Sequence, residues 1–510
     1  MGRKLSTPAR GYHWRGPGRP VGRYPMPARL AQQGIVGCAL TRDAPLSHSE
    51  CMFKKVLVAN RGEIACRVLK TCERLEIASV AVFSDADVLA PHVAQADEAI
   101  RLGPAPARES YLSIDALVAA IEHTGADAVH PGYGLLSENR AFAEAVAKAG
   151  ATFIGPPPEA LEAFGDKIKA RAVARAVGVA PPPGSDGPLD PDDTSHLEAE
   201  ARRIGYPVLI KTAGGGGGIG MQLVREPQAL AKAARTCADR GKAAFGDSRV
   251  YVERYLDTPR HIEVQVFRDQ QGRAVALGER ECSVQRRHQK VIEEAPSPAS
   301  FFDGEAGAQR RKKLHADALR IIEAAHYLGA GTVEFVADAQ GELFFLEVNA
   351  RLQVEHPVTE MVFGLDLVEL QLNIAAGQPL PERLEQRKPS GHAVEARVYA
   401  EDPKKKFLPQ PGTLEHLEWP TLESVRVDSG VVEGGSVTHY YDPLIAKVIA
   451  HGANRDEAVK RLDAALAATR IELVGPKGLR ATNVELLRQV LAEPRFASGD
   501  YDTGLLDTMG

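Results

Sequence analysis

Residues 346–355 carry a polar side chain at every second position. In an extended chain, alternate side chains point to the same side. One side of this run would therefore carry Glu347, Asn349, Arg351, Gln353 and Glu355. A solvated strand shows the same alternation, but usually with interchangeable Lys, Thr and Ser. The mixture of carboxylates, amides and a guanidinium instead indicates a site for charged ligands.

A second acidic residue is predicted to lie opposite Glu347. Glu334 belongs to the apolar run 332–336, and the chain turns near residues 339–341, so the two segments form a hairpin. Two carboxylates that close together, with Asn349 beside them, destabilise the fold unless a cation neutralises them. Oxygen ligands of this kind suit Mg²⁺ or Mn²⁺ that bridges nucleotide phosphates. We therefore predict a metal site at Glu334, Glu347 and Asn349.

Five consecutive glycines, residues 214–218, lie between two apolar segments. Their amides can approach phosphate oxygens closely, and the loop can open and close. Because both flanking segments are predicted strands, this is a glycine hairpin and not the strand-to-helix loop of a Walker site. A flexible surface linker is the alternative, but linkers mix Ser with Gly and seldom join apolar strands. Lys211 leaves the first strand just before the loop, where it can reach a phosphate.

A basic cluster, residues 286–290, also lies between apolar strands. Runs of this kind are most often solvated turns. The position of the cluster, together with the glycine loop and the carboxylates, favours an anion site instead. His288 and Lys290 point to one side if the backbone is extended there.

The elements that would position these residues begin with a strand, a helix and a strand over residues 56–60, 63–74 and 80–84. This order predicts a βαβ unit, and a further strand, 128–130, leads into the loop 131–134. Loops at the carboxyl ends of parallel strands form the binding edge of an open sheet. The first turn lacks the GxGxxG spacing, so a dinucleotide site is not supported.

Length and composition predict several domains. At 510 residues, with 44% hydrophobic and 25% charged residues, the chain exceeds what one hydrophobic core supports. It has no apolar run long enough to cross a bilayer, and its six cysteines lack metal-ligand or disulfide spacing. We therefore expect a cytoplasmic protein without a membrane partner. The chain has no basic stripe beyond residue 52, so nucleic acid is not an expected partner.

Residues 1–51 are rich in Arg, Pro and Gly and lack apolar periodicity. We expect this segment to be disordered or to result from a start codon assigned too early, with Met52 as the real start. A mitochondrial transit peptide is the alternative, because such peptides are also Arg-rich and acid-poor.

Taken together, these motifs resemble the biotin carboxylase family, within the ATP-grasp superfamily, from about Met52 onward. The strings that carry the resemblance are ANRGEI (59–64), HPGYG (130–134), LSEN (136–139), GDK (165–167), the glycine run, RRHQK (286–290), EVNARLQVEHP (347–357) and HAVEAR (392–397). The resemblance implies an α/β and α+β multidomain fold. It has a Rossmann-like N-terminal domain (52–165), an ATP-grasp domain (166–385) with a mobile glycine-rich lid (about 182–252), and an α+β C-terminal domain (386–510).

The resemblance also implies ATP- and bicarbonate-dependent carboxylation of biotin through carboxyphosphate. The implied contacts to the ATP phosphates are Lys167, Lys211, Gly217 and Gly218. The implied adenine pocket is formed by Glu253, Arg254, Tyr255 and Leu256, with His261 and His288 nearby. Bicarbonate would lie among Lys290, Arg351, Gln353 and the amide of Val354, with Glu355 as its general base. Tyr133 and Arg397 would lie beside biotin, where Arg397 steadies the enolate, while Glu334, Glu347 and Asn349 match metal ligands.

Biotin acceptor domains present a lysine between methionines, and no methionine of this chain adjoins a lysine. We therefore expect the biotin carboxyl carrier protein and the carboxyltransferase to be separate polypeptides, and the family is commonly dimeric. Residues 395–403, with the following residues 407–409, look more like the subunits of acyl-CoA carboxylases than those of pyruvate carboxylase. Two departures from the family pattern are Ile219, where relatives usually carry Arg or Lys, and Arg254, where Lys is common.

Two other functions remain as alternatives. Another ATP-grasp carboxylate ligase would share the fold, but the clusters 288–290 and 353–355 argue against it. A non-catalytic, nucleotide-binding paralogue would be expected to have lost a metal ligand or the base, and both are present here.

Overall fold

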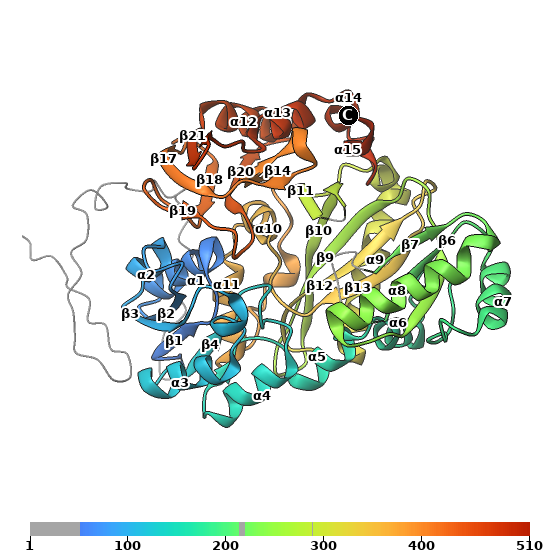
Figure 1. The fold of residues 1–510 in the computed structure, drawn as a ribbon, viewed down its shortest axis with the longest axis horizontal. Coiled ribbons are helices and arrows are strands. Elements are labelled where there is room, and N and C mark those ends of the chain that lie inside the picture. The colour runs from blue at the N-terminus through green and yellow to red at the C-terminus, as the bar shows by residue number, and fades with distance from the viewer. Residues whose placement is uncertain (1–51, 214–219, 288, 510) are drawn as a thin grey trace, which may run out of the picture.

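The computed structural model describes residues 52–213, 220–287 and 289–509. The predictions for Gly217, Gly218, Ile219, His288 and residues 1–51 fall outside these ranges. The described residues form three groups of elements (Figure 1): an N-terminal group in blue, a central group in green and yellow, and a C-terminal group in orange and red.

The N-terminal group is a parallel sheet with helices, ordered β3-β2-β1-β4-β5. Its elements are β1 (Lys55–Val58), α1 (Gly62–Arg74), β2 (Ala78–Ser84), α2 (Pro91–Gln95), β3 (Glu98–Gly103), α3 (Ile114–Thr124), β4 (Ala128–His130), α4 (Arg140–Lys148) and β5 (Thr152–Phe153). The strand order reverses between β1 and β4, and a crevice at that point is the usual ligand site of such sheets. Asn60 joins the loops at this edge, because its Nδ2 donates to Pro131 O at 2.7 Å and to Tyr133 O at 2.8 Å. The predicted Rossmann-like arrangement is confirmed.

A small antiparallel sheet, ordered β7-β6-β8, follows two helices and is itself covered by two more. These elements are α5 (Pro158–Gly165), α6 (Lys167–Ala176), α7 (Thr194–Ile204), β6 (Val208–Thr212), β7 (Gln222–Val224), α8 (Leu230–Phe245) and β8 (Val250–Arg254). Val208 pairs with Val224 and Ile210 with Gln222, so β6 and β7 are the two arms of a hairpin. The prediction that the segments on either side of the glycine run are strands is confirmed, and residues 214–219 themselves lie outside the described residues.

A large sheet, ordered β13-β12-β9-β10-β11-β14-β20-β18, runs through the middle of the molecule. Its strands are β9 (Arg260–Arg268), β10 (Ala274–Arg286), β11 (Gln289–Ala295), β12 (Gly329–Ala337), β13 (Leu343–Asn349), β14 (His392–Tyr399), β18 (Val425–Ser429) and β20 (Leu444–Gly452). The antiparallel pair β11–β14 joins strands from either side of the domain boundary predicted at residues 385 and 386. Residues of the central and C-terminal segments therefore share one sheet and can contribute to one site.

The remaining helices pack on these sheets, and the remaining strands form small sheets in the C-terminal group. They are α9 (Gly304–Ala324), α10 (His356–Phe363), α11 (Leu367–Ala375), β15 (Glu401–Asp402), β16 (Leu408–Pro409), β17 (Gly412–Glu418), β19 (Ser436–Val437), α12 (Arg455–Ala468), β21 (Arg470–Gly475), β22 (Gly478–Leu479), α13 (Val484–Ala492), α14 (Pro494–Ser498) and α15 (Leu505–Thr508). The predicted α+β C-terminal arrangement is confirmed.

The prediction that residues 346–355 form one extended strand is wrong beyond Asn349. The last cross-strand pair joins Asn349 to Thr332. The next amide, Ala350 N–H, donates instead to Glu138 Oε1 at 2.9 Å, and so leaves the ladder. The chain then turns, and Glu355 precedes the first residue of α10, whose early proline favours a helix start.

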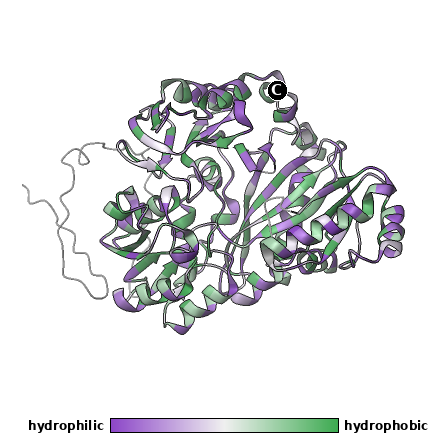
Figure 2. Cartoon of the chain, in the orientation of Figure 1, coloured by the Kyte–Doolittle hydropathy of each residue, from purple (hydrophilic) through white to green (hydrophobic). Residues whose placement is uncertain are grey.

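Hydrophilic residues lie within the strands of the large sheet as well as on the surface (Figure 2). Glu263, Arg280 and Lys447 in these strands, and Glu355 just before α10, are charged and each 0% exposed. Buried charges are rare unless they are paired, so their partners identify the candidate site. Among the described helices none is long and apolar enough to cross a membrane, and the four described cysteines are free.

Candidate functional site

The side chain of Lys290 on β11 lies among three carboxylates. Its Nζ donates to Glu263 Oε2 at 2.6 Å, to Glu355 Oε1 at 2.6 Å and to Glu334 Oε1 at 2.9 Å. Burial alone would lower the pKa of Lys290, but nearby Cys282 and the three carboxylates outweigh it and raise this pKa well above its usual value. Lys290 is therefore a fixed positive charge, held by strands β9 and β12 and by the start of α10.

The register of the large sheet creates this acidic cluster. Glu334 on β12 lies directly opposite Glu263 on β9, and like charges in such positions destabilise a sheet. Two cations and a histidine offset the repulsion. Besides Lys290, Arg280 Nε lies 2.5 Å from Glu263 Oε1, and His261 Nε2 lies 2.8 Å from Glu334 Oε2. The arrangement is thus a buried, alternating charge network rather than isolated pairs.

Glu355 joins this network to the C-terminal group of elements. Its Oε2 accepts from Arg397 Nη2 at 2.8 Å, while its Oε1 faces Lys290. Burial would raise the pKa of Glu355, but Lys290, Arg397 and Arg280 outweigh burial and hold it well below the usual range. The carboxylate is therefore ionised, and an ionised carboxylate is the form that can accept a proton.

Arg351 links the predicted metal and anion residues. Its Nη1 donates to Gln353 Oε1 at 2.8 Å and its Nη2 to Asn349 Oδ1 at 3.0 Å. Its Nε donates to Glu138 Oε2 at 2.9 Å, and Glu138 lies just before α4. Gln353 in turn donates to Glu334 Oε1 at 3.0 Å. The predicted polar residues do come together, although a loop and not a strand brings them there.

The predicted metal residues offer the oxygen atoms that Mg²⁺ or Mn²⁺ requires. Glu334 and Glu347 are directly opposite on β12 and β13, and Asn349 lies two residues further on. The side-chain amine of Lys167 contacts Glu347, and the Asn349 Nδ2 is buried without a hydrogen-bond partner among the described residues. Two carboxylates and an amide oxygen fit a hard divalent cation. The structure also brings His261, Glu263 and Glu334 within 4.8 Å, but Lys290 already supplies positive charge between those two carboxylates.

Lys167 and Lys211 both lie at the end of β6. Asp166 caps α6 by accepting from Ile168 N at 2.9 Å, which makes Lys167 the first residue of the helix. The Lys167 N–H donates to Ala213 O at 3.1 Å, so the end of β6 lies beside it. The Lys211 amine contacts the carboxylate of Glu253, which also accepts from Arg171 Nη1 at 2.9 Å.

The residues predicted to line the adenine pocket lie at the end of β8. Glu253 is buried, whereas Arg254 is exposed and both Tyr255 and Leu256 are half-buried. No ion pair or hydrogen bond between the described residues joins these four side chains to the Lys290 network. Their role in binding adenine stays a prediction.

Tyr133 and Val354 both lie close to Lys447, a residue that the sequence motifs did not indicate. The Tyr133 hydroxyl donates to Glu63, and Lys447 Nζ lies 3.2 Å from the same Glu63 oxygen. Lys447 Nζ also donates to Val354 O at 2.8 Å. Lys447 is 0% exposed, and it therefore ties α1, the loop before α10 and strand β20 together.

Sequence reasoning missed Glu263, Arg280, Glu293, Glu395 and Lys447. Polar alternation inside apolar strands was the available signal, since His261, Glu263 and Gln265 share one side of β9. Glu293 and Glu395 lie opposite each other on β11 and β14. Burial raises the pKa of Glu293 to about 7, although Arg397 contacts it. Such pairs follow from strand register, which the sequence alone does not supply.

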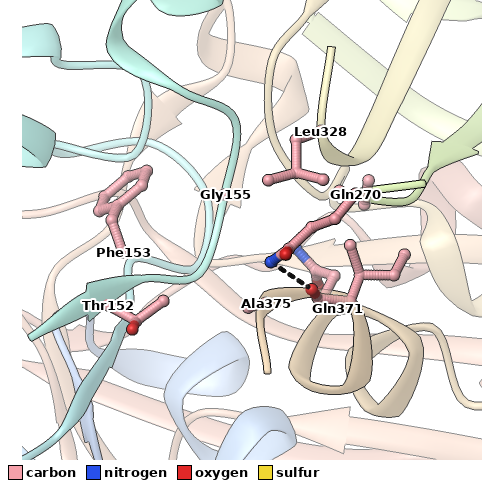
Figure 3. Close-up of a pocket in the computed structure, with 10 residues that line it drawn as sticks. Thr152, Phe153, Gly155, Gln270, Leu328, Gln371 and Ala375 are labelled. Carbon is pink, nitrogen blue, oxygen red and sulfur yellow. Dashed lines mark hydrogen bonds between the residues drawn. The ribbon is translucent and has the colours of Figure 1, made fainter. Parts of the chain in front are cut away.

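A cavity of about 70 Å³ lies between β5 and α11, away from all these charges. Thr152, Phe153, Gln270, Leu328 and Gln371 are among its lining residues (Figure 3), and none is a predicted site residue. Small-molecule pockets usually measure roughly 300–1,000 Å³. The cavity is therefore too small for a nucleotide, and the charged network is the better candidate site.

Three sequence profiles of known families match successive parts of the chain. They are the biotin carboxylase N-terminal domain (residues 52–161), the carbamoyl-phosphate synthase L chain ATP-binding domain (166–383) and the biotin carboxylase C-terminal domain (395–508). The chain is 47% identical over 456 residues to a biotin carboxylase from Halalkalibacterium halodurans, covering 89% of this chain and 97% of that protein. It is 47% identical over 461 residues to the mitochondrial propionyl-CoA carboxylase alpha chain of Sus scrofa, of which it covers 61%.

Solved structures agree with the sequence matches. A biotin carboxylase from Campylobacter jejuni, in complex with beta-gamma-ATP, superimposes with a TM-score of 0.84 at 41% identity, covering 90% of this chain and 99% of that one. The biotin carboxylase domain dimer of Hydrogenobacter thermophilus 2-oxoglutarate carboxylase, with MgADP and bicarbonate, gives a TM-score of 0.84 at 40% identity, covering 90% and 98%. This chain therefore belongs to the biotin carboxylase family.

Proposed function

We propose that this chain is a ligase that carboxylates biotin, converting ATP, bicarbonate and biotin to ADP, phosphate and carboxybiotin. The observation that carries the proposal is the position of Glu355, ionised and buried between Lys290 and Arg397. A base, two cations and Arg351 in one network match what bicarbonate needs to become a nucleophile. Relatives named biotin carboxylases, at 47% identity, support the same reaction.

Bicarbonate binding would change the basicity of Glu355. A general base works best when its pKa lies near the working pH, and the surrounding cations now hold this pKa far lower. An anion bound among Lys290, Arg351, Gln353 and the Val354 amide would share those cations. The pKa of Glu355 would then rise, and the carboxylate could take the bicarbonate proton.

The bicarbonate oxygen then attacks the terminal phosphorus of ATP, the bond to ADP breaks, and carboxyphosphate forms. Lys167 and Lys211 would bind the phosphates, since a hydrogen-bonded ammonium stabilises charge in phosphoryl transfer. A Mg²⁺ ion held by Glu334, Glu347 and Asn349 would supply positive charge for the same phosphates. The glycine hairpin, by closing over the nucleotide, would exclude water from an intermediate that hydrolyses.

Carboxyphosphate breaks down to CO₂ and phosphate, and the phosphate takes the proton from the ureido nitrogen of biotin. The nitrogen then bonds to CO₂. We assign Arg397 to the developing enolate oxygen of the ureido group, and Tyr133 to a position beside the ring. Arg397 is buried, and its guanidinium contacts the carboxylates of Glu293 and Glu355, so it can pass from Glu355 to a ligand oxygen as the site fills.

We further propose that biotin is presented by a separate biotin carboxyl carrier protein and that a separate carboxyltransferase uses the product. A homodimer is proposed because the related Hydrogenobacter thermophilus domain is described as a dimer. An acyl-CoA is proposed as the final acceptor of the carboxyl group, because propionyl-CoA carboxylase alpha chains are among the relatives. The cytoplasmic location stays a prediction from cysteine usage.

Steady-state ATP hydrolysis by the full chain tests the function. We expect hydrolysis that requires bicarbonate and rises on addition of free biotin. Hydrolysis that does not depend on bicarbonate but increases on addition of an amino acid would instead indicate another ATP-grasp ligase. A chain that binds ATP without turning it over under any of these conditions would be a non-catalytic paralogue.

A further inference from the structure

The hairpin β15–β16 presents three consecutive lysines to solvent. Glu401 pairs with Pro409 and Asp402 with Leu408, so residues 403–407 form its tip. Lys404, Lys405 and Lys406 are all exposed, and Leu408 beside them is 56% exposed. Three adjacent positive charges and an apolar residue thus lie on the surface of a chain whose net charge is −5.

The tip has a defined shape. Lys406 and Phe407 both have positive φ, 56° and 59°, which is uncommon and costly for a bulky residue such as Phe407. Several contacts hold it there: Phe407 N donates to Asp402 O at 2.9 Å, and Asp402 Oδ1 accepts from Lys404 N at 3.1 Å. Lys405 Nζ pairs with Asp402 at 2.9 Å. The lysines are therefore presented by a pre-organised loop, which lowers the entropy cost of binding a partner.

The hairpin is attached directly to the candidate active site. The guanidinium of Arg286 lies 4.4 Å from the centre of the Phe407 ring and also pairs with Glu401. Arg286 itself pairs across β10 and β11 with Gln289, the residue before Lys290. On the other side, Glu401 follows Arg397 by four residues, a distance of roughly 13 Å in an extended chain. A partner bound to the tip would therefore lie close to Arg397 and Lys290.

Two of the three lysines form no ion pair within the part of the chain that the structure describes. No ion pair with Lys404 or Lys406 exists among the residues that the structure describes, whereas Lys405 has Asp402. Adjacent like charges repel one another, and a complementary acidic surface would relieve that repulsion. Leu408 adds an apolar anchor next to the charges.

We propose that residues 404–408, at and beside the tip of this hairpin, are the docking surface for an acidic face of the protein domain that carries biotin. The proposal rests on the proposed function and deepens it by naming how the carrier is recognised. Charge complementarity would speed the encounter and orient the biotin arm toward Arg397. Free biotin, which has no such face, would not use the surface.

The test compares three substrates of matched chemistry. They are a peptide with a biotinylated lysine flanked by Asp and Glu, the same peptide with Asn and Gln in their place, and free biotin. Each is assayed with the full chain, with the double variant Lys404→Glu/Lys406→Glu, and with the control Lys148→Glu/Lys477→Glu. The control makes the same charge change at two exposed lysines, on α4 and in the β21–β22 turn. Lys405 is left unchanged because it supports the loop through Asp402.

We expect kcat/KM for the acidic peptide to exceed that for the neutral peptide by about tenfold at low salt, at the lower end of electrostatic steering. The Lys404/Lys406 variant should lose this preference and keep its free-biotin activity, while the control keeps both. The preference of the unaltered protein should also shrink as salt rises from about 0.1 M to 1 M, because the screening length falls from roughly 10 Å to 3 Å.

Equal kcat/KM values for the two peptides, or an equal loss in both variants, would overturn the proposal. Fluorescence anisotropy of the labelled acidic peptide, measured without ATP, tests docking even if no turnover is found. In that case the proposed function fails and the docking proposal is judged by anisotropy alone. Binding of an oligonucleotide but not of the acidic peptide would also overturn it. If the Glu variant does not fold by circular dichroism, Lys404→Gln/Lys406→Gln and the salt series on the unaltered protein decide between the same outcomes.

Discussion

Replacement of Glu355 by glutamine should separate ATP binding from turnover. Glutamine keeps the shape of the side chain but cannot accept the bicarbonate proton. Loss of a general base typically costs roughly 10²–10⁴ in rate, which corresponds to about 2.7–5.5 kcal/mol of barrier. Nucleotide affinity should stay within about threefold, because Glu355 contacts Lys290 and Arg397 and neither of the lysines assigned to phosphate.

The same change should lower stability by a moderate amount. Removal of one member of a buried ion pair costs about 3–5 kcal/mol when the other charge is left alone. Here Lys290 keeps Glu263 and Glu334, and Arg397 keeps Glu293, so we expect about 1–3 kcal/mol. The folded-state pKa of Glu355 is depressed. Its contribution to stability is therefore full above the ordinary carboxyl pKa and is lost as the pH falls through the lower folded value.

The assay is bicarbonate-dependent ATP hydrolysis with free biotin, together with calorimetric titration of nucleotide and a urea unfolding curve. Glu342→Gln is the matched control, since Glu342 is an exposed glutamate in the turn between β12 and β13. Turnover of Glu355→Gln within tenfold of the unaltered protein would refute the base assignment. A parallel loss of nucleotide affinity would show that Glu355 acts on ATP binding instead.

Three further predictions follow from other parts of the structure. Burial raises the folded-state pKa of Glu293 to about 7 from 4.5, so the stability of the protein should fall as the pH rises between those values. Urea unfolding at pH 5 and pH 8 should show that Glu293→Gln reduces this fall by about 3 kcal/mol. An unchanged pH dependence would contradict this prediction. Arg67→Met should lower the free energy of unfolding by about 3 kcal/mol, since Arg67 is buried and binds Glu360 at 2.6 Å and Asp366 at 2.7 Å. Arg74→Met, at a side chain 50% exposed, should lower it by less than about 1 kcal/mol. Equal losses would refute the burial argument. A chain that begins at Met52 should match the full chain in melting temperature and turnover, because residues 1–51 lack a pattern that could bury surface; a large drop in either would show otherwise.

Local chemistry in this chain was predictable from sequence, because it depends on neighbours along the chain. The apolar segments on either side of the glycine run are the paired strands β6 and β7, and Glu334 does lie opposite Glu347, since a short turn near residue 340 leaves little choice of register. The alternation of strands and helices predicted the N-terminal βαβ unit, whereas the fold of the other domains followed from the family resemblance. These features need only the period of side chains and the length of turns.

Contacts between distant segments were not predictable in this way. Lys290 binds Glu263, which lies 27 residues earlier, and Glu355, which lies 65 residues later. That meeting depends on which strands are neighbours in the large sheet. The end of β13 was also missed. Alternation in the sequence continues to Glu355, but the Ala350 amide donates to the Glu138 carboxylate and not to a neighbouring strand. Pairing of β11 with β14 across the predicted domain boundary has the same origin.

Transfer of radiolabelled bicarbonate to free biotin tests the central claim most directly. The full chain is incubated with ATP, Mg²⁺, labelled bicarbonate and biotin. The amount of labelled carboxybiotin is then compared with the amount of ADP formed. We predict label in biotin that requires all four reactants and is absent with Glu355→Gln. Formation of ADP without any label in biotin, under conditions where nucleotide binds, would contradict the account.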